Sequence, residues 1–406
     1  MGIFKPAVTQ KTIERINKMR VHYPENKFAM RLKWYLLAVL LILGSAFQPF
    51  AQTEKDLLKK SKLNNLSESN KSNLKSDDKL YSQESQRLRA KSFHADFTKA
   101  RQSGMDVETK LISKSGQEKM NTILVKMAKE VPLSEEYHYA NYVNSNYATS
   151  EISELDKAYQ VADDKSIYYD DYIAHFELVG NKSKKSEFCH LLNKSGIVSE
   201  GVLAYNYNVL MSIEENGILF VNGSDDTYPI WIHQQNKIRT DITILNTDLL
   251  GDDSYRKKKM LELGITEELN YNADRKAYMK SIAKNNPQKP IYFGLTVSPA
   301  LIKEIKAELY LTGLALKYSR STIENIPILQ GNWENKFNTL SLNKEHTNST
   351  VRKMNMNYML PLLLLSETYN SQGNEKQAVL CNNLAINLAK EGGKEKVIKQ
   401  YLDKRE

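Results

Sequence analysis

The sequence predicts an α/β protein, in which a small domain with a parallel sheet is flanked by α-helical hairpins. Residues 217–221 form a short, fully apolar run of the kind found in strands buried on both faces. Two further strand-like runs, at 240–245 and 290–297, are spaced from it so that helices can lie between the strands. Before and after these runs, apolar residues recur every three or four positions, as in helices.

The first 51 residues have the pattern of a secretory signal. A basic flank precedes the apolar run Trp34–Leu43, the small residues Gly44, Ser45 and Ala46 follow it, and Ala51 comes a few residues later. A membrane span needs about twenty apolar residues, so this run is too short to be one. We therefore expect export to the periplasm or the medium, cleavage after Ala51 or alternatively Ala46, and no permanent membrane span. Retention as an uncleaved anchor is the less favoured alternative, and Met30 is a plausible true start.

The charge of the chain does not favour nucleic-acid binding. The formal net charge is +9, but residues 1–33 contain eight Lys and Arg side chains against two Glu, which leaves about +3 for the rest. A basic nucleic-acid-binding face therefore has little support. The two cysteines, Cys189 and Cys381, have no spacing typical of redox or zinc motifs. We expect them to be free buried thiols, although an oxidising compartment would permit a bridge.

Composition and periodicity divide the remaining chain into four segments. They are a linker at 52–96, an α-helical, tetratricopeptide-like region at 97–196, the α/β domain at 197–325, and a second linker with a helical hairpin at 326–406. The linker at 52–96 is poor in large apolar groups, so we expect it to be disordered.

Two helical hairpins stand out, each with a Gly-Asn turn between apolar stripes. Either one would need a neighbour to cover its apolar face, as in repeat proteins. The first pairs Ile167–Val179 with Lys182–Leu192, and the second pairs Asn357–Ser371 with Glu375–Ala389. Within the α/β domain, a short helix is expected over Tyr228–Gln235 and another over Leu301–Leu311.

The candidate site lies where the first strand ends and the next helix begins. Open parallel sheets bind ligands at this edge, and free amides at a helix start favour anionic or hydroxyl-rich partners. Asp225 and Asp226 could receive sugar hydroxyls or a hard cation, although the same residues make a good turn and helix cap on structural grounds alone. Arg239 and Asp241 could pair at the approach to the second strand. The candidate ligand-binding residues are Asn222, Ser224, Asp225, Asp226, Thr227, Arg239, Asp241, Asn246 and Thr247. No catalytic residue, cofactor or resident metal is indicated.

The run from Asn216 to Trp231, followed by Ile238–Asp241, resembles a segment in a family of large Bacteroidota membrane proteins. That family is classed with protein O-mannosyltransferases of the multi-span glycosyltransferase C type, and the segment belongs to its soluble periplasmic part. Lys289–Phe293 with Thr296–Pro299, and Leu311–Ala315, resemble later motifs of the same part. The loop differs mildly, because the family tends to have Asp-Asn-Asp-Thr where this chain has Ser224–Thr227.

The resemblance covers roughly residues 200–390 and implies the soluble appendage without the membrane-embedded transferase, so it carries over no catalytic residue. Three hypotheses remain open. The first is a non-catalytic periplasmic module that binds an envelope protein or a glycan and assists envelope glycosylation. The second is an enzyme that acts on a polar, glycan-like substrate through Asp225 and Asp226. The third is a purely structural helical scaffold.

Overall fold

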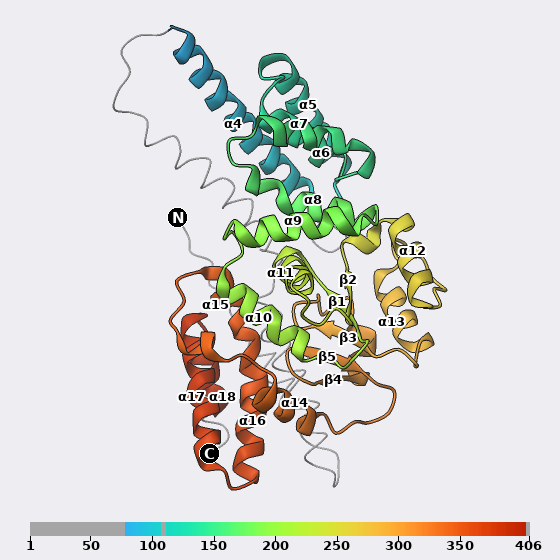
Figure 1. The fold of residues 1–406 in the computed structure, drawn as a ribbon, viewed down its shortest axis with the longest axis vertical. Coiled ribbons are helices and arrows are strands. Elements are labelled where there is room, and N and C mark those ends of the chain that lie inside the picture. The colour runs from blue at the N-terminus through green and yellow to red at the C-terminus, as the bar shows by residue number, and fades with distance from the viewer. Residues whose placement is uncertain (1–77, 107–110, 403–406) are drawn as a thin grey trace. The chain divides into compact units, whose positions relative to one another are not determined.

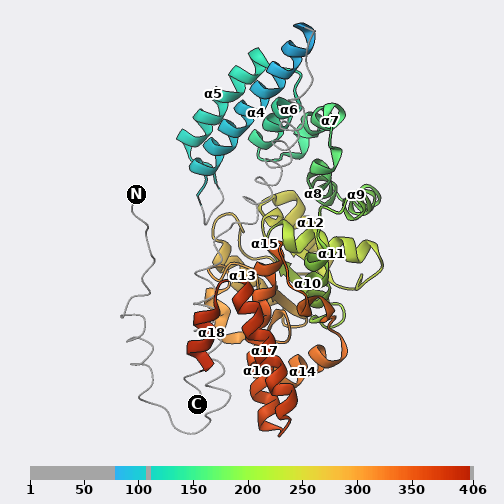
Figure 2. The ribbon, with the colours of Figure 1, turned by 90° about the vertical axis from the view of Figure 1, so that its left-hand side faces the viewer.

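The computed structural model describes residues 78–106 and 111–402, and the segment expected to be the signal lies outside these residues. Three pairs of consecutive helices open the described chain, and the partners of each pair lie side by side (Figures 1 and 2). These helices, with two short 3-10 turns, are α4 (Asp78–Gly104), α5 (Lys114–Glu130), α6 (Glu135–Asn144), η1 (Thr149–Glu151), α7 (Ile152–Val161), η2 (Lys165–Tyr168), α8 (Tyr169–Leu178) and α9 (Lys182–Lys194).

Helix α4 begins inside the segment 52–96 that composition predicted to be a disordered linker, so for residues 78–96 that prediction was wrong. Ala90 is fully buried in the helix, and Phe97 is 1% exposed. Near its end, the backbones of Gly104 and Gly116 approach so closely that a Cβ on either would lie 2.7 Å from the other's Cα. Packing against α5 therefore orders a helix that is too polar to be recognised from composition.

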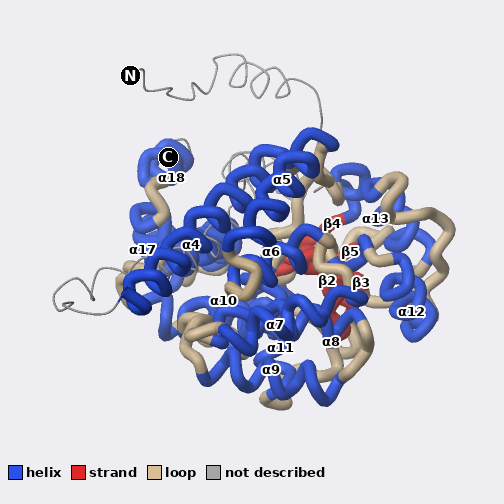
Figure 3. Tube along the Cα trace, turned by 90° about the horizontal axis from the view of Figure 1, so that it is seen from above, coloured by secondary structure: helices blue, strands red, loops and turns tan. Residues whose placement is uncertain are grey.

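The α/β part contains a five-stranded mixed sheet, and helices lie on both sides of the strands (Figure 3). The strand order is β2-β1-β3-β5-β4, with β2, β1 and β3 parallel and the last two strands antiparallel. The elements are α10 (Glu200–Met211), β1 (Ile218–Val221), α11 (Ser224–Gln235), β2 (Thr243–Asn246), η3 (Leu249–Gly251), α12 (Asp253–Leu263), α13 (Arg275–Asn285), β3 (Ile291–Gly294), η4 (Lys303–Glu308), β4 (Leu309–Leu311) and β5 (Ala315–Tyr318).

The connections place helices on both faces of the sheet. The step from β1 to β2 and the step from β2 to β3 cross the sheet in opposite directions. Because such crossovers are right-handed, α11 lies on one face and the pair α12–α13 on the other, and Figure 1 draws them on opposite sides of the strands. All four residues of β1 are buried, and the Phe220 and Phe293 rings stack with their centroids 5.2 Å apart. The predicted fold class, a small parallel-sheet domain with flanking helices, is confirmed.

Two features of the sheet differ from the sequence prediction. The expected helix Leu301–Leu311 is wrong, because only Lys303–Glu308 turn as a 3-10 helix and Leu309–Leu311 form the edge strand β4. Leu309 and Leu311 are buried while Tyr310 between them is partly exposed, which is the alternation of a strand. The antiparallel strands β4 and β5 were not predicted at all.

The C-terminal part is helical and contains the second predicted hairpin. Helices α16 and α17 run side by side, and the Asn374 side chain caps α17 by accepting from the Gln377 amide at 3.3 Å (Figures 1 and 2). The elements are α14 (Asn325–Asn335), η5 (Leu340–Asn343), α15 (Ser349–Asn355), η6 (Met356–Tyr358), α16 (Met359–Ser371), α17 (Glu375–Glu391) and α18 (Glu395–Leu402). The first predicted hairpin is α8–α9, capped by Asn181 in the same way. Cys189 and Cys381 are both buried and free, as expected.

Among the residues that the structure describes, no helix is both long and apolar enough to cross a membrane.

Candidate functional site

Seven of the nine predicted site residues gather at the carboxyl edge of the parallel strands. Residues 222–227 follow β1. Asn246 is the last residue of β2, and Thr247 comes directly after it. Since β1, β2 and β3 are parallel, the loop after β3 reaches the same edge and contributes Thr296. We call this set of loops the carboxyl-edge cluster.

Asn246 ties the β2 end to the start of α11. Its Nδ2 donates to Thr227 Oγ1 at 2.8 Å and to the Gly223 carbonyl at 3.3 Å. Its Oδ1 accepts from the backbone amides of Asp248 at 2.7 Å and Leu249 at 3.1 Å. Both the nitrogen and the oxygen of the Asn246 side-chain amide are therefore engaged in hydrogen bonds within the protein.

Asn222 and Thr247 form a second link between the same loops. Thr247 Oγ1 donates to Asn222 Oδ1 at 3.1 Å, and the Thr247 amide donates to the Val221 carbonyl at 2.9 Å. The buried hydroxyl of Tyr271 also donates to the Thr247 carbonyl, at 2.6 Å. These bonds hold the two loops as a rigid pair.

Gly223 makes the turn into α11 possible. Its backbone has φ 74° and ψ −176°, a conformation that is open essentially to glycine alone. Thr227 Oγ1 donates to the Gly223 carbonyl at 2.6 Å, which fixes the first turn of the helix behind it. The loop geometry thus depends on the glycine that the sequence supplies.

Asp226 is the titratable group of the cluster with the strongest shift. Its side chain is 5% exposed, and its carboxylate accepts from the Thr296 hydroxyl and from the Asn222 backbone amide. The pKa of Asp226 is raised to about 7, chiefly by burial, and the nearby charge of Asp225 acts in the same direction. The Thr296 hydrogen bond and the charge of Lys353 lower it, but they do not offset the burial. The carboxyl therefore exchanges its proton near neutral pH.

A second layer of buried polar residues lies behind Asp226, and the sequence prediction missed it. Burial raises the pKa of Tyr205 well above its usual value, and the charge of Asp226 acts in the same direction. The Asn357 side chain donates to the Tyr205 hydroxyl at 2.9 Å. Asn206 donates to the Asp225 carbonyl at 2.9 Å, while its buried Oδ1 has no partner. The signal was present as the polar run Tyr205–Asn208 within the otherwise apolar helix α10.

Arg239 and Asp241 pair as expected, but they do not join the carboxyl-edge cluster. They precede β2 and so lie at the amino edge of the sheet, opposite the other seven residues. Arg239 makes two hydrogen bonds of 2.9 Å to the Asp241 carboxylate, which lower the pKa of Asp241. The guanidinium also donates to the carbonyls of Leu210 at 3.0 Å and Ile213 at 2.8 Å. The pair thus caps the carboxyl end of α10.

No group of three or more His, Cys, Asp or Glu side chains in the described part of the chain is arranged to hold a metal ion. His233, which follows the cluster on α11, places its Nε2 2.8 Å from the Leu203 carbonyl, and burial lowers its pKa. The contact with the Leu203 carbonyl therefore gives His233 a structural role.

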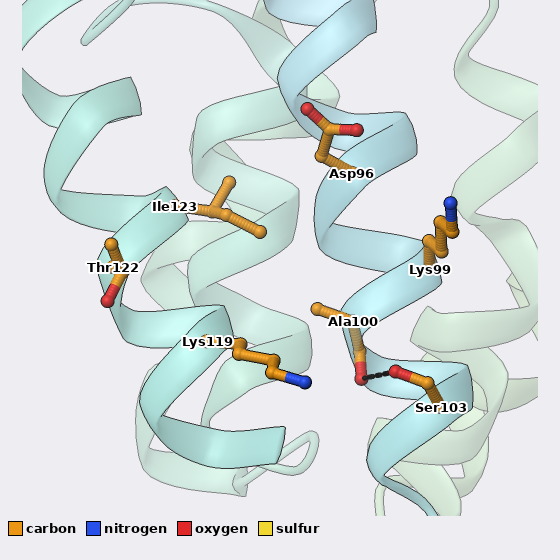
Figure 4. A pocket seen from close by; sticks show the side chains of 7 residues that line it. All are labelled: Asp96, Lys99, Ala100, Ser103, Lys119, Thr122 and Ile123. Atoms are coloured by element: carbon orange, nitrogen blue, oxygen red, sulfur yellow. Dashed lines mark hydrogen bonds between the residues drawn. The ribbon is translucent and has the colours of Figure 1, made fainter. Parts of the chain in front are cut away.

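Two surface hollows lie on helices away from the sheet. Figure 4 shows the first, between α4 and α5, where Ala100 and Ile123 lie between the helices and Asp96 and Lys119 border them. Its hydroxyl groups bond to their own helices, as Ser103 does to the Ala100 carbonyl at 3.1 Å. The second hollow is lined by Trp333, Glu334, Tyr369, Asn374 and Gln377.

The comparisons with known proteins give one match. A family model described as TMEM260-associated domain 2 matches residues 202–281, which run from α10 into α13. The matched segment contains the loops after β1 and β2, but not Thr296 or Asn357. No curated protein and no solved structure matches the chain.

Proposed function

We propose that this chain is a non-catalytic accessory module of protein glycosylation, which binds an envelope protein or a glycan for a membrane-bound transferase. The family model at residues 202–281 supports the link, because its description associates the domain with TMEM260, a candidate O-mannosyltransferase. The matched residues include the two loops that form most of the carboxyl-edge cluster. The module would act in the periplasm or outside the cell, as the pattern of residues 1–51 suggests.

The observation that carries the proposal is that the cluster's polar side chains are bonded to one another. Asn246 bonds to Thr227, and Thr247 bonds to Asn222. An enzyme that performs acid–base chemistry needs two groups free to meet the substrate, and this edge offers one strongly perturbed carboxyl. A rigid, internally bonded edge is better suited to presenting a binding surface than to proton transfer.

The experiment is cross-linking of the exported chain in intact cells, followed by mass spectrometry of its neighbours. We expect a membrane glycosyltransferase or its glycosylated substrates to be enriched over a cross-linked control envelope protein of similar abundance. A chain that is monomeric and without neighbours in the envelope would refute the proposal and favour the structural scaffold.

A second candidate function, an enzyme acting on a glycan-like substrate, is favoured by Asp226 alone. A carboxyl that exchanges its proton near pH 7 has the property of a general acid or base. Purified chain should then hydrolyse or transfer a mannosyl group from a model mannoside, and Asp226→Asn should abolish that activity without unfolding the protein. Absence of turnover by the folded wild-type chain would remove this candidate.

A further inference from the structure

The second hollow, formed by α14, α16 and α17, lies outside the carboxyl-edge cluster and outside the matched residues 202–281. It has a volume of about 350 Å³, within the lower range of small-ligand sites. Trp333 and Glu334 come from the last turn of α14, and Tyr369 from α16. Asn374 is the N-cap of α17, and Gln377 lies in its first turn. Segments that are distant in sequence thus contribute different chemical groups to one place.

Glu334 is held in position without an ionic partner. Its Oε1 accepts from the Tyr369 hydroxyl at 2.7 Å and from Gln330 Nε2 at 2.9 Å. Gln330 is steadied in turn by an amide–amide contact of 3.1 Å with Gln372. No Lys or Arg in the described residues forms an ion pair with Glu334, and its Oε2 has no hydrogen-bond partner there. One carboxylate oxygen is therefore fixed and the other is left to accept.

Trp333 and the amide side chains supply the remaining groups. The Trp333 ring is half-buried, and the centroids of the Phe337 and Tyr358 rings lie 6.1 and 6.5 Å from its own. Its indole N–H has no hydrogen-bond partner among the described residues. Asn374 and Gln377 are both exposed, and the Asn374 oxygen is engaged by the Gln377 backbone amide. The Asn374 amino group and the Gln377 amide remain available as donors and acceptor.

We propose that this hollow binds a short neutral glycan. A sugar ring has one apolar face and a rim of hydroxyls, each of which can donate and accept. The half-buried indole matches the apolar face, while the Glu334 carboxylate and the two amides match the rim. An anionic ligand is disfavoured by Glu334, and an apolar ligand would leave these polar groups unpaired. A cationic side chain would use the carboxylate and the indole but would gain nothing from the amide donors.

The test is a titration of the purified full chain with mannobiose, followed through the Trp333 indole N–H signal in a nitrogen–proton NMR spectrum. We expect binding with a Kd of about 1 mM or tighter, because the hollow is small and open. Glu334→Gln should weaken binding about tenfold or more, since hydrogen bonds to a charged group are the stronger ones. Glu375→Gln is the matched control, because it makes the same change on the first turn of α17, outside the hollow, and should leave binding unchanged.

Gln377→Ala provides a second variant that cannot fail by unfolding, because the side chain is exposed and Ala favours the helix. It should weaken binding several-fold. Cellobiose and lactose are titrated in parallel, and a lower Kd for mannobiose than for these two disaccharides would show that mannose is preferred. The proposal is overturned if no disaccharide shifts the Trp333 signal at millimolar concentration, if Glu334→Gln and Glu375→Gln behave alike, or if only a lysine-containing peptide binds. None of these outcomes bears on whether the chain contacts a glycosyltransferase.

Discussion

Replacing Asp226 by Asn should make the protein more stable above neutral pH. The side chain keeps its shape but loses the charge that burial opposes. The pKa of Asp226 rises from 3.8 to about 7 on folding, so the folded state binds this proton more tightly than the unfolded state does. The free energy of unfolding therefore falls as pH rises from about 4 through 7, and above pH 7 the full penalty is present.

The size of the effect follows from the shift. At about 1.4 kcal/mol per pKa unit, roughly three units correspond to an upper limit of about 4 kcal/mol. Asn can accept only through one oxygen, and it turns an amino group toward either Thr296 or the Asn222 amide, which costs about 1 kcal/mol. We therefore expect a net gain of about 1–3 kcal/mol for Asp226→Asn at pH 8.5. At pH 5 we expect little change, because there the folded carboxyl is protonated while the unfolded one is ionised, so that only the first part of the penalty is present and it roughly offsets the cost of the Asn side chain.

Urea unfolding followed by circular dichroism at pH 5 and pH 8.5 measures this difference directly. The wild type should lose stability between the two pH values relative to the variant. Asp241→Asn is the control with the opposite sign, because the bond with Arg239 lowers the pKa of Asp241 and its loss should destabilise at both pH values. A variant at position 226 that is less stable than the wild type at pH 8.5 would refute the reasoning, since the carboxylate would then be charged and stabilising.

Three further predictions concern single side chains. Glu177→Gln should lower the free energy of unfolding, measured in a thermal melt, by about 3–5 kcal/mol. In the wild type the Lys185 and Lys259 ammonium groups lie 2.6 and 2.9 Å from the Glu177 carboxylate, and the substitution leaves both without an anionic partner. Although burial raises the pKa of Glu177, the two lysine charges hold it at about 2, so this stabilisation should be present above about pH 4.5 and disappear as pH falls toward 2. Arg239→Gln should cost about 2 kcal/mol by uncapping α10, measured by urea unfolding, with no change in the Trp333 NMR signal. Gly223→Ala should cost about 1–3 kcal/mol in the same assay because of its backbone conformation, although a Cβ there would meet no neighbour.

The parts of the fold that the sequence revealed are those with a strong local pattern. The three parallel strands were visible because each is a short run rich in apolar and β-branched residues, and both hairpins were visible because a Gly-Asn turn separates two apolar stripes. Helix α12 was missed because Lys257, Lys258 and Lys259 interrupt its apolar stripe. Strands β4 and β5 have three and four residues, too few for an alternation to be recognised.

The carboxyl-edge cluster was predictable in its loops but not in its partners. The rule that parallel strands present their ends at one edge was enough to bring residues 222–227 and 246–247 together. Thr296 is 70 residues from Asp226, and Asn357 is 152 residues from Tyr205, so neither contact has a local signature. Arg239 and Asp241 pair at the approach to β2 as the sequence predicted, but because both precede that strand they lie at the opposite edge from the other candidate residues.

A chain that assists glycosylation without performing the chemistry should be needed for glycan occupancy, while its Asp226 carboxyl should not be. The most direct measurement is glycan occupancy of envelope proteins, by quantitative glycopeptide mass spectrometry, in cells that lack the chain and in cells that produce the wild type or Asp226→Asn. We expect occupancy to fall when the chain is absent and to be restored equally by both forms. Unchanged occupancy without the chain would contradict the proposed function, and restoration by the wild type but not by folded Asp226→Asn would show that the carboxyl takes part in the reaction.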